Sequence, residues 1–210
     1  SQDTARDNQG YDETYNNSYG DFFFYFHLRP QCNSWRQVRK DVILYLPMDI
    51  SYLGKDGFKI KAKNGTVTTT ASKLTIAHKS GGEDFVITQP GEYEVEGISV
   101  FGYKAETNNV YVIQFDDVRV AYLGNIEKSL SEKSVSELEN IDVVILSVDN
   151  IATKDSVELV SKLEPYYVLP YGEQTAKFVA SYEHASRTVK SLNLSKVSLN
   201  EDLTEVIVFE

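Results

Sequence analysis

The chain has 210 residues, of which 41% are hydrophobic and 25% charged, and this ordinary composition predicts a globular protein with a sizeable core. Its formal net charge of −10 argues against nucleic acid and anionic membrane as partners, because both select for clustered Lys and Arg. A single cysteine, Cys32, cannot form an internal disulfide, and no apolar run approaches the roughly 20 residues of a membrane span, so we expect a cytoplasmic protein.

Residues 1–47 differ in character from the rest of the chain. Residues 1–21 are rich in Asn, Asp, Gln, Ser and Tyr without periodicity, which indicates irregular or disordered chain, and an aromatic cluster follows at Phe22–Phe26. Met48, the only methionine, stands directly before the first clear strand. Two explanations are open: the native chain starts at Met48, or the preceding residues form an aromatic arm that docks on a partner. We therefore expect an N-terminal extension over 1–47 and one domain over 48–210.

Short strands fill the first half of this domain. Runs of apolar, β-branched and aromatic residues are separated by turns, many of them containing Gly or Asn, as hairpins require. The expected strands are Ile50–Leu53, Phe58–Ala62, Thr66–Thr70, Leu74–His78, Asp84–Thr88, Ile98–Tyr103, Val110–Phe115 and Val118–Leu123. The last two flank Asp116 and Asp117, a two-residue connection that a tight hairpin tolerates.

Strands alternate with helices in the second half. Asp142–Val148 is a nearly continuous apolar run, which is typical of a strand buried on both faces. Thr153 and Asp155 can cap a helix that Pro165 ends. The elements expected after it are a strand at Tyr166–Leu169, a helix at Glu173–Tyr182, and strands at Ser195–Leu199 and Glu205–Phe209. Antiparallel hairpins followed by βαβ units predict a mixed α/β domain, with two sheets packed face to face and helices outside.

Five segments follow one family's pattern in the same order along the chain. They are Ile50–Gly54 (ISYLG), Leu74–His78 (LTIAH), Pro90–Gly97 (PGEYEVEG), Val118–Asn125 (VRVAYLGN) and Leu163–Tyr171 (LEPYYVLPY). On these segments the chain from Met48 to its end resembles the metallo-β-lactamase superfamily, and within it the bacterial L-ascorbate-6-phosphate-lactonase-like proteins. The resemblance implies a four-layer αββα sandwich, here shortened, whose members hydrolyse their substrates with zinc or manganese.

Most positions that hold metal in this family carry other residues here. The resemblance places Lys55 and Gly172 where the family has histidines, and Asn125 where it has a bridging aspartate. His78 matches the first histidine of the family's HxHxDH loop, and the rest of that loop is shortened away. A catalytic zinc needs about three protein ligands, and a neutral amide supplies no charge to hold two cations. We therefore interpret these four positions as a vestigial pocket, and expect no metal ligand, no catalytic residue and no cofactor.

Two of the four positions have expected structural roles. At Lys55 the ammonium is a candidate to fill the vacated cation volume, much as a salt bridge replaces a metal. A lone histidine at a strand end, such as His78, is usually structural. No GxSxG elbow, P-loop or CxxC motif points to other chemistry.

Three functions are open. The first is a metallo-β-lactamase-fold protein that has lost metal-dependent hydrolysis and serves as a binding or assembly module, because zinc supplies this fold's nucleophile by lowering the pKa of water from 15.7 to about 7. The alternative is an active hydrolase of a lactone or phosphoester, with a mononuclear metal site drawn from His78, Asp84, Asp149 or His184. The third is a homo-oligomer that exposes strand edges or tyrosine-rich surface to its own copies. The sequence identifies no substrate and no partner.

Overall fold

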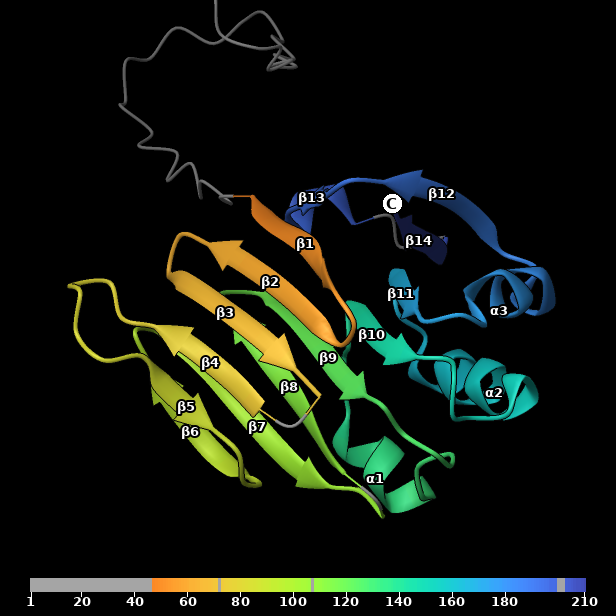
Figure 1. Cartoon of the computed structure of the whole chain (residues 1–210), viewed down its shortest axis with the longest axis horizontal. Helices are drawn as coiled ribbons and strands as arrows, with labels where there is room; N and C mark the ends of the chain where they lie inside the picture. The colour runs from red at the N-terminus through yellow and green to blue at the C-terminus, as the bar shows by residue number, and fades with distance from the viewer. Residues whose placement is uncertain (1–46, 72, 107, 200–202) are drawn as a thin grey trace, which may run out of the picture. The chain divides into compact units, whose positions relative to one another are not determined.

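The computed structural model describes residues 47–71, 73–106, 108–199 and 203–210 (Figure 1). Within these ranges the chain forms two β-sheets, three α-helices and one short 3-10 helix. No helix in this part of the chain is long and apolar enough to cross a membrane. The predictions for the N-terminal extension up to residue 46, including the aromatic cluster Phe22–Phe26, concern residues outside the described ranges, as do His27 and Cys32.

The smaller sheet has six antiparallel strands in the order β13-β1-β2-β3-β4-β5 (Figure 1). They are β1 (Met48–Gly54), β2 (Gly57–Ala62), β3 (Gly65–Thr70), β4 (Lys73–Ala77), β5 (Phe85–Ile87) and β13 (Leu192–Leu194). In β2, Phe58 and Ile60 are buried while Lys59 and Lys61 are exposed. One face of the sheet therefore packs inside and the other is polar, as is common for antiparallel sheets.

The larger sheet has eight strands in the order β12-β14-β11-β10-β9-β8-β7-β6. They are β6 (Gly91–Val95), β7 (Ile98–Lys104), β8 (Asn109–Phe115), β9 (Val118–Gly124), β10 (Val143–Ser147), β11 (Tyr167–Tyr171), β12 (Ala185–Val189) and β14 (Glu205–Phe209). Strands β6 to β9 pair antiparallel, whereas β9, β10, β11, β14 and β12 pair parallel. The parallel half brings the carboxyl ends of β9, β10 and β11 to one edge of the sheet.

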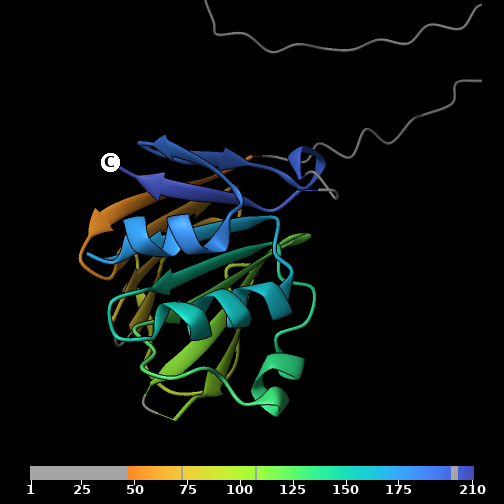
Figure 2. The same ribbon diagram turned by 90° about the vertical axis from the view of Figure 1, so that its right-hand side faces the viewer.

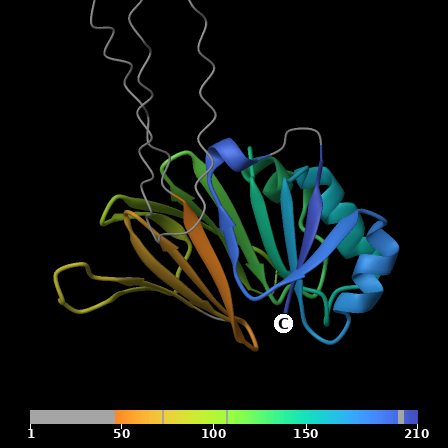
Figure 3. The same ribbon diagram turned by 90° about the horizontal axis from the view of Figure 1, so that it is seen from above.

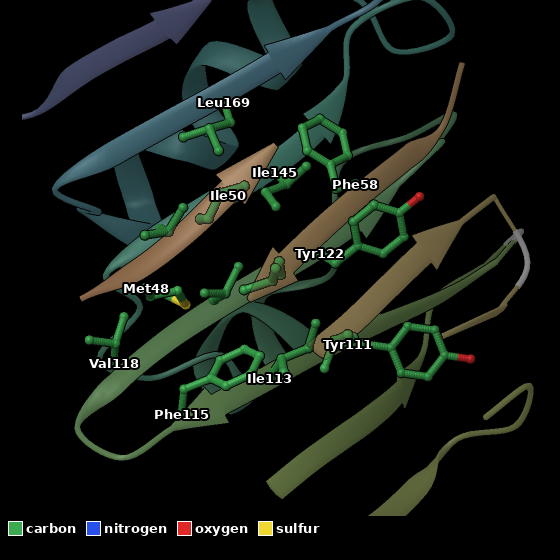
Figure 4. Packing of buried hydrophobic residues seen from close by; sticks show 14 of the residues in the cluster. Met48, Ile50, Phe58, Tyr111, Ile113, Phe115, Val118, Tyr122, Ile145 and Leu169 are labelled. Carbon is green, nitrogen blue, oxygen red and sulfur yellow. The ribbon is translucent and has the colours of Figure 1, made fainter. Parts of the chain in front are cut away.

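The two sheets pack face to face, and the helices lie on the outer face of the larger sheet (Figures 2 and 3). The helices are α1 (Glu132–Glu137), α2 (Thr153–Leu163) and α3 (Thr175–Tyr182). Adjacent residues of β10 serve different cores, because Ile145 packs between the sheets with Phe58 and Tyr122 (Figure 4), whereas Val144 packs with Leu159 of α2. The predicted mixed domain with two packed sheets is confirmed, and the described helices cover the larger sheet alone.

Most of the predicted strands and helices are present, and one prediction is wrong. Residues Ser195–Leu199 are not a strand, because Lys196–Ser198 form a 3-10 helix and the strand of this region is β13, directly before it. The Ser195 backbone N–H donates to Ser198 Oγ at 2.8 Å, so local serine capping favours a turn over a strand. Two elements, α1 and β12, were not predicted: α1 has six residues, and β12 is mostly exposed.

Candidate functional site

A cavity of about 660 Å³ opens at the carboxyl ends of the parallel strands. In open α/β sheets, ligands bind in the crevice outside this edge. The lining side chains come from the β1–β2 turn, from the residues that follow β9, β10 and β11, and from β14; they include Tyr52, Lys55, Asp56, Asn125, Ser147, Asp149, Asn150, Tyr171, Gly172, Glu173 and Phe209. The cavity is therefore the first candidate for a functional site, on topology alone.

The turn between β1 and β2 forms one wall of the cavity and is tied to the larger sheet. Tyr122 Oη, from β9, donates to the Asp56 carbonyl at 2.9 Å, and Tyr52 Oη donates to the Lys55 carbonyl at 2.7 Å. Lys55 adopts a positive φ of 52° in the turn. Its side chain is exposed, lines the cavity and takes part in none of the ion pairs among the described residues.

Asp149 and Gly172 form the most tightly constrained contact in the cavity. The Gln174 N–H, at the start of α3, donates to Asp149 Oδ1 at 3.0 Å. Gly172 has a φ of +114°, and a Cβ added to it would collide with both carboxylate oxygens of Asp149. A side chain at position 172 would therefore require the Asp149 carboxylate to move. The position to which the resemblance assigns a histidine is thus taken up by a carboxylate from the neighbouring strand end.

Two amides face each other at the cavity. Asn150 Nδ2 donates to Asn125 Oδ1 at 2.8 Å. One of the two lone pairs of the Asn125 oxygen is therefore used by another side chain. An amide oxygen is also a weaker ligand than a carboxylate, since it carries no charge.

Aromatic rings make up another wall. The rings of Tyr52, Phe58, Tyr171 and Phe209 form one cluster, with Tyr52 lying 6.0 Å from Tyr171 and 6.2 Å from Phe209 between ring centroids. Burial raises the pKa of Tyr171, and its Oη finds no hydrogen-bond partner among the described residues. Burial also raises the pKa of Tyr52, and the nearby charges of Asp56 and Asp149 raise it further. Both phenols therefore stay protonated at neutral pH.

His78 lies apart from this cavity. It follows β4 in the smaller sheet and is not among the residues that line the cavity, whereas Lys55, Asn125 and Gly172 are. The Ser80 N–H donates to His78 Nδ1 at 3.3 Å, and the same nitrogen lies 3.4 Å from Oε1 of Glu96 in the β6–β7 turn. The imidazole thus connects the edges of the two sheets. Of the four positions expected to share a pocket, the structure brings three together.

The donor set does not fit the metal centre that the resemblance implies. In the described ranges, no three His, Cys, Asp or Glu side chains are grouped so that they could hold a metal ion. Of the residues considered for a mononuclear site, His78 and Asp84 are neighbours in the β4–β5 loop, Asp149 lines the cavity, and His184 stacks on Tyr182 after α3 at 4.0 Å. That mononuclear site is therefore not assembled.

Most of the residues that shape the cavity carry no signal in the sequence. Asp149 was considered only as a metal ligand, and Tyr52, Asp56, Asn150 and Phe209 were not considered for the site. One signal was available, because a glycine at position 172 permits close approach by another group.

Comparison with known proteins bears on the fold. The family model described as the β-lactamase superfamily domain matches residues 63–172. A solved Thermotoga maritima structure, assigned to the zinc-dependent hydrolases of the metallo-β-lactamase superfamily, is 21% identical with a TM-score of 0.65, covering 77% of this chain and 98% of that one. At this identity the likeness shows the fold alone.

Two further solved structures are more distant. A structure from Parabacteroides distasonis, assigned as a metal-dependent hydrolase, is 13% identical with a TM-score of 0.40, covering 63% of this chain and 94% of that one. CmlA, a diiron β-hydroxylase from Streptomyces venezuelae, is 11% identical with a TM-score of 0.40, covering 50% and 33%. No curated protein matches the chain. These two likenesses are too weak to carry an argument.

Proposed function

Because the chain belongs to the β-lactamase superfamily domain family, whose model matches residues 63–172 of 210, we propose that it is a member that has lost metal-dependent hydrolysis and binds a small ligand in the carboxyl-edge cavity. We place it near the L-ascorbate-6-phosphate-lactonase-like branch, on the ordered segments of its sequence. In this proposal the protein is a binding module and not an enzyme.

The contact between Asp149 and Gly172 carries the proposal. A metal ligand at position 172 needs a side chain, and a Cβ there collides with the Asp149 carboxylate where it now lies. Asp149 is itself held by the Gln174 N–H. A ligand histidine at position 172 would therefore have to displace the Asp149 side chain from this hydrogen bond.

The other residues at the cavity support the same reading. Catalytic zinc sites use about three protein ligands, and two-metal sites need more than that. Lys55 contributes an ammonium, which repels a cation, and the Asn125 oxygen accepts from Asn150. Three carboxylates line the cavity, those of Asp56, Asp149 and Glu173, but they are not grouped so that they could hold a metal ion together.

The cavity still has the properties of a small-molecule site. Its volume of about 660 Å³ lies within the range of roughly 300–1,000 Å³ that is typical of such sites. Aromatic rings line one side, and a few polar groups with spare hydrogen-bonding capacity line the other. The fold is thus expected to keep the pocket while the chemistry of the metal is lost.

Elemental analysis tests this proposal directly. The full chain, purified without an affinity tag that binds metal, is incubated with excess zinc and manganese, desalted, and analysed by inductively coupled plasma mass spectrometry. We expect well under one metal ion per ten chains. A content close to one or two ions per chain would overturn the proposal.

A hydrolysis assay tests the alternative function. Purified protein is incubated with a lactone and with a phosphodiester, with and without a chelator. Turnover that the chelator abolishes, and that His78→Ala also abolishes, would establish an active hydrolase with a non-standard site. We expect no turnover above the buffer rate in either case.

A further inference from the structure

The charge of the carboxyl-edge cavity selects against anions. Three carboxylates line it, those of Asp56, Asp149 and Glu173, against the single ammonium of Lys55. A helix N-terminus commonly binds anions through its free N–H groups. Here the Gln174 N–H at the start of α3 already donates to Asp149 Oδ1 at 3.0 Å, so the protein's own carboxylate takes the place of an anionic ligand.

Asp149 keeps binding capacity that this hydrogen bond does not use. An ionised carboxylate has two oxygens with about four acceptor sites. Within the described residues, the side chain of Asp149 accepts one hydrogen bond, at Oδ1, and its carboxylate is exposed. Oδ2 is thus available to a donor that enters the cavity.

The aromatic wall offers the second half of a cation site. Tyr52 and Phe209 line the cavity with rings that are only half-buried, and Tyr171, 5% exposed, lies behind them with an unpartnered Oη. The face of an aromatic ring is electron-rich and attracts a cation within about 6 Å. Burial and the charges of Asp56 and Asp149 raise the pKa of Tyr52, which indicates that both carboxylates act on the same wall.

We infer that this cavity binds a small organic cation, an ammonium or guanidinium group held between the Asp149 and Asp56 carboxylates and the rings of Tyr52 and Phe209. The inference rests on the proposed function, because it requires a cavity free of metal. An organic cation needs no ordered set of ligand atoms, so the loss of metal ligands does not weaken its site. The ring faces attract a cation more strongly than they attract a neutral hydroxyl group. The net negative charge of the lining also raises the local concentration of cations.

Calorimetric titration of the full chain is the first test. The probes are choline, n-butylammonium and methylguanidinium, and the control is 3,3-dimethyl-1-butanol, a neutral molecule with nearly the shape of choline. We expect at least one cation to bind with a Kd of about 1 mM or tighter, and the neutral control to bind at least about tenfold more weakly than choline does if choline is that cation. The inference is overturned if none of the three cations binds, or if the neutral molecule binds as well as choline.

The second test uses charge variants that are expected to change the cation affinity in opposite directions. Asp149→Asn keeps an oxygen for the Gln174 N–H but removes the charge, and we expect it to weaken cation binding about tenfold. Lys55→Gln removes the only ammonium of the lining, and we expect tighter binding. Asp56→Asn repeats the first change at the other carboxylate, in case Asp149→Asn proves unstable. Weakening by Lys55→Gln, or no effect of either aspartate variant, contradicts the inference.

The matched control is Asp117→Asn. Asp117 is an exposed carboxylate in the β8–β9 turn, and its substitution changes the net charge by the same amount. It should leave cation binding unchanged. Equal weakening by Asp117→Asn and Asp149→Asn would mean that the cation follows the overall charge of the protein, and that no site exists.

The metal measurement separates the two proposals. If the chain contains little metal and no cation binds, the proposed metal-free function is kept and the proposed cation site is rejected. If the chain holds stoichiometric metal, the proposed function fails, and titration of the chelator-treated protein then decides whether a cation binds at the same carboxylates.

Discussion

Two aspartates bracket the central strand β10, and their surroundings differ. Asp142 precedes the strand and is 2% exposed; its carboxylate accepts hydrogen bonds from the Arg119 N–H at 2.7 Å and from Lys196 Nζ at 2.8 Å. Asp149 follows the strand, is exposed, and accepts one backbone N–H, that of Gln174. Both oxygens of Asp142 are engaged by the scaffold, whereas Oδ2 of Asp149 has no donor among the described residues. The two carboxylates thus differ in what they leave open to a ligand, although the residue type is the same.

The size of a cavity does not make the same distinction. A larger cavity, of about 790 Å³, lies beside Asp142, at the amino ends of the parallel strands. There the carboxylate of Asp142 is paired with Lys196, which also lies 6.0 Å from the Tyr166 ring. The charges of Asp142 and Lys196 in the larger cavity therefore neutralise each other, whereas the lining of the smaller cavity has three carboxylates and one ammonium. The smaller cavity is the better candidate for ligand binding.

Asp142→Ala gives the largest expected effect. It leaves the part-buried Arg119 N–H without its acceptor and removes the partner of Lys196, and we expect the free energy of unfolding to fall by about 2 kcal/mol. Lys196 is 40% exposed and regains water, which keeps the loss below that of a fully buried pair. Asp149→Ala should cost less than about 1 kcal/mol, because one surface hydrogen bond is lost. Urea denaturation measures both, and equal losses would abolish the contrast between the two ends of β10.

Gly172→Ala sharpens the description of the Asp149 end. The substitution combines a φ of +114° with a collision against Asp149, and we expect it to cost about 2 kcal/mol. Gly97→Ala is the matched control, because Gly97 also has a positive φ, of +76°, but its Cβ would meet open space. The control should cost about 1 kcal/mol. Thermal unfolding of both variants isolates the collision, and identical losses would show that Asp149 moves aside freely.

Alkaline pH tests the tyrosines beneath the Asp149 end. Burial raises the pKa values of Tyr122 and Tyr171 above their unfolded value of about 10. Because the pKa is higher in the folded state, the stability that each tyrosine contributes is fully present below about pH 10. This contribution is lost as the pH rises towards the folded pKa. At about pH 11 we expect the free energy of unfolding to be lower by about 1 kcal/mol for each of the two tyrosines.

Melting temperatures between pH 8 and 11 measure this loss. Lysines also titrate there, so the wild-type curve is compared with that of Tyr171→Phe, which should fall less steeply. A Tyr171→Phe curve parallel to the wild type would remove the tyrosine from the explanation. At neutral pH the same variant should be no less stable, because its Oη has no hydrogen-bond partner among the described residues.

His78→Ala gives the smallest expected effect. His78 is 41% exposed in its side chain and contacts Glu96 across the sheet edges, so we expect a loss below about 0.5 kcal/mol. Cation binding at Asp149 should not change, because His78 does not line that cavity. A changed cation affinity would show that the β4–β5 loop and the carboxyl edge are coupled. Glu96→Gln, at the other side of the contact, serves as the matched variant.

Periodicity and turn chemistry predicted most of the fold. The apolar run at Asp142–Val148 and the hairpin at Asp116 and Asp117 are present, because local pattern and tertiary packing agree there. The strand predicted at Ser195–Leu199 failed because serine capping within the segment outweighed its apolar spacing. Strand β12 was missed because its Ala185–Thr188 residues are exposed and carry no pattern of burial.

The site was harder to predict than the fold. Order along the chain sufficed to place Lys55, Asn125 and Gly172 near one another, because they follow strand ends that the sheets bring together. It failed for His78, which lies beside Glu96 and does not line the cavity. It also gave no sign of what fills the space at Gly172, since Asp149 arrives there through tertiary packing across two strand ends.

The fit of Asp149 against Gly172 also matters for redesign of this edge. A histidine introduced at position 172 would place its Cβ where the Asp149 carboxylate now lies, so the aspartate side chain would have to shift. A designed metal site here is therefore expected to need a second substitution, to a smaller residue at position 149, beside the new ligand at position 172.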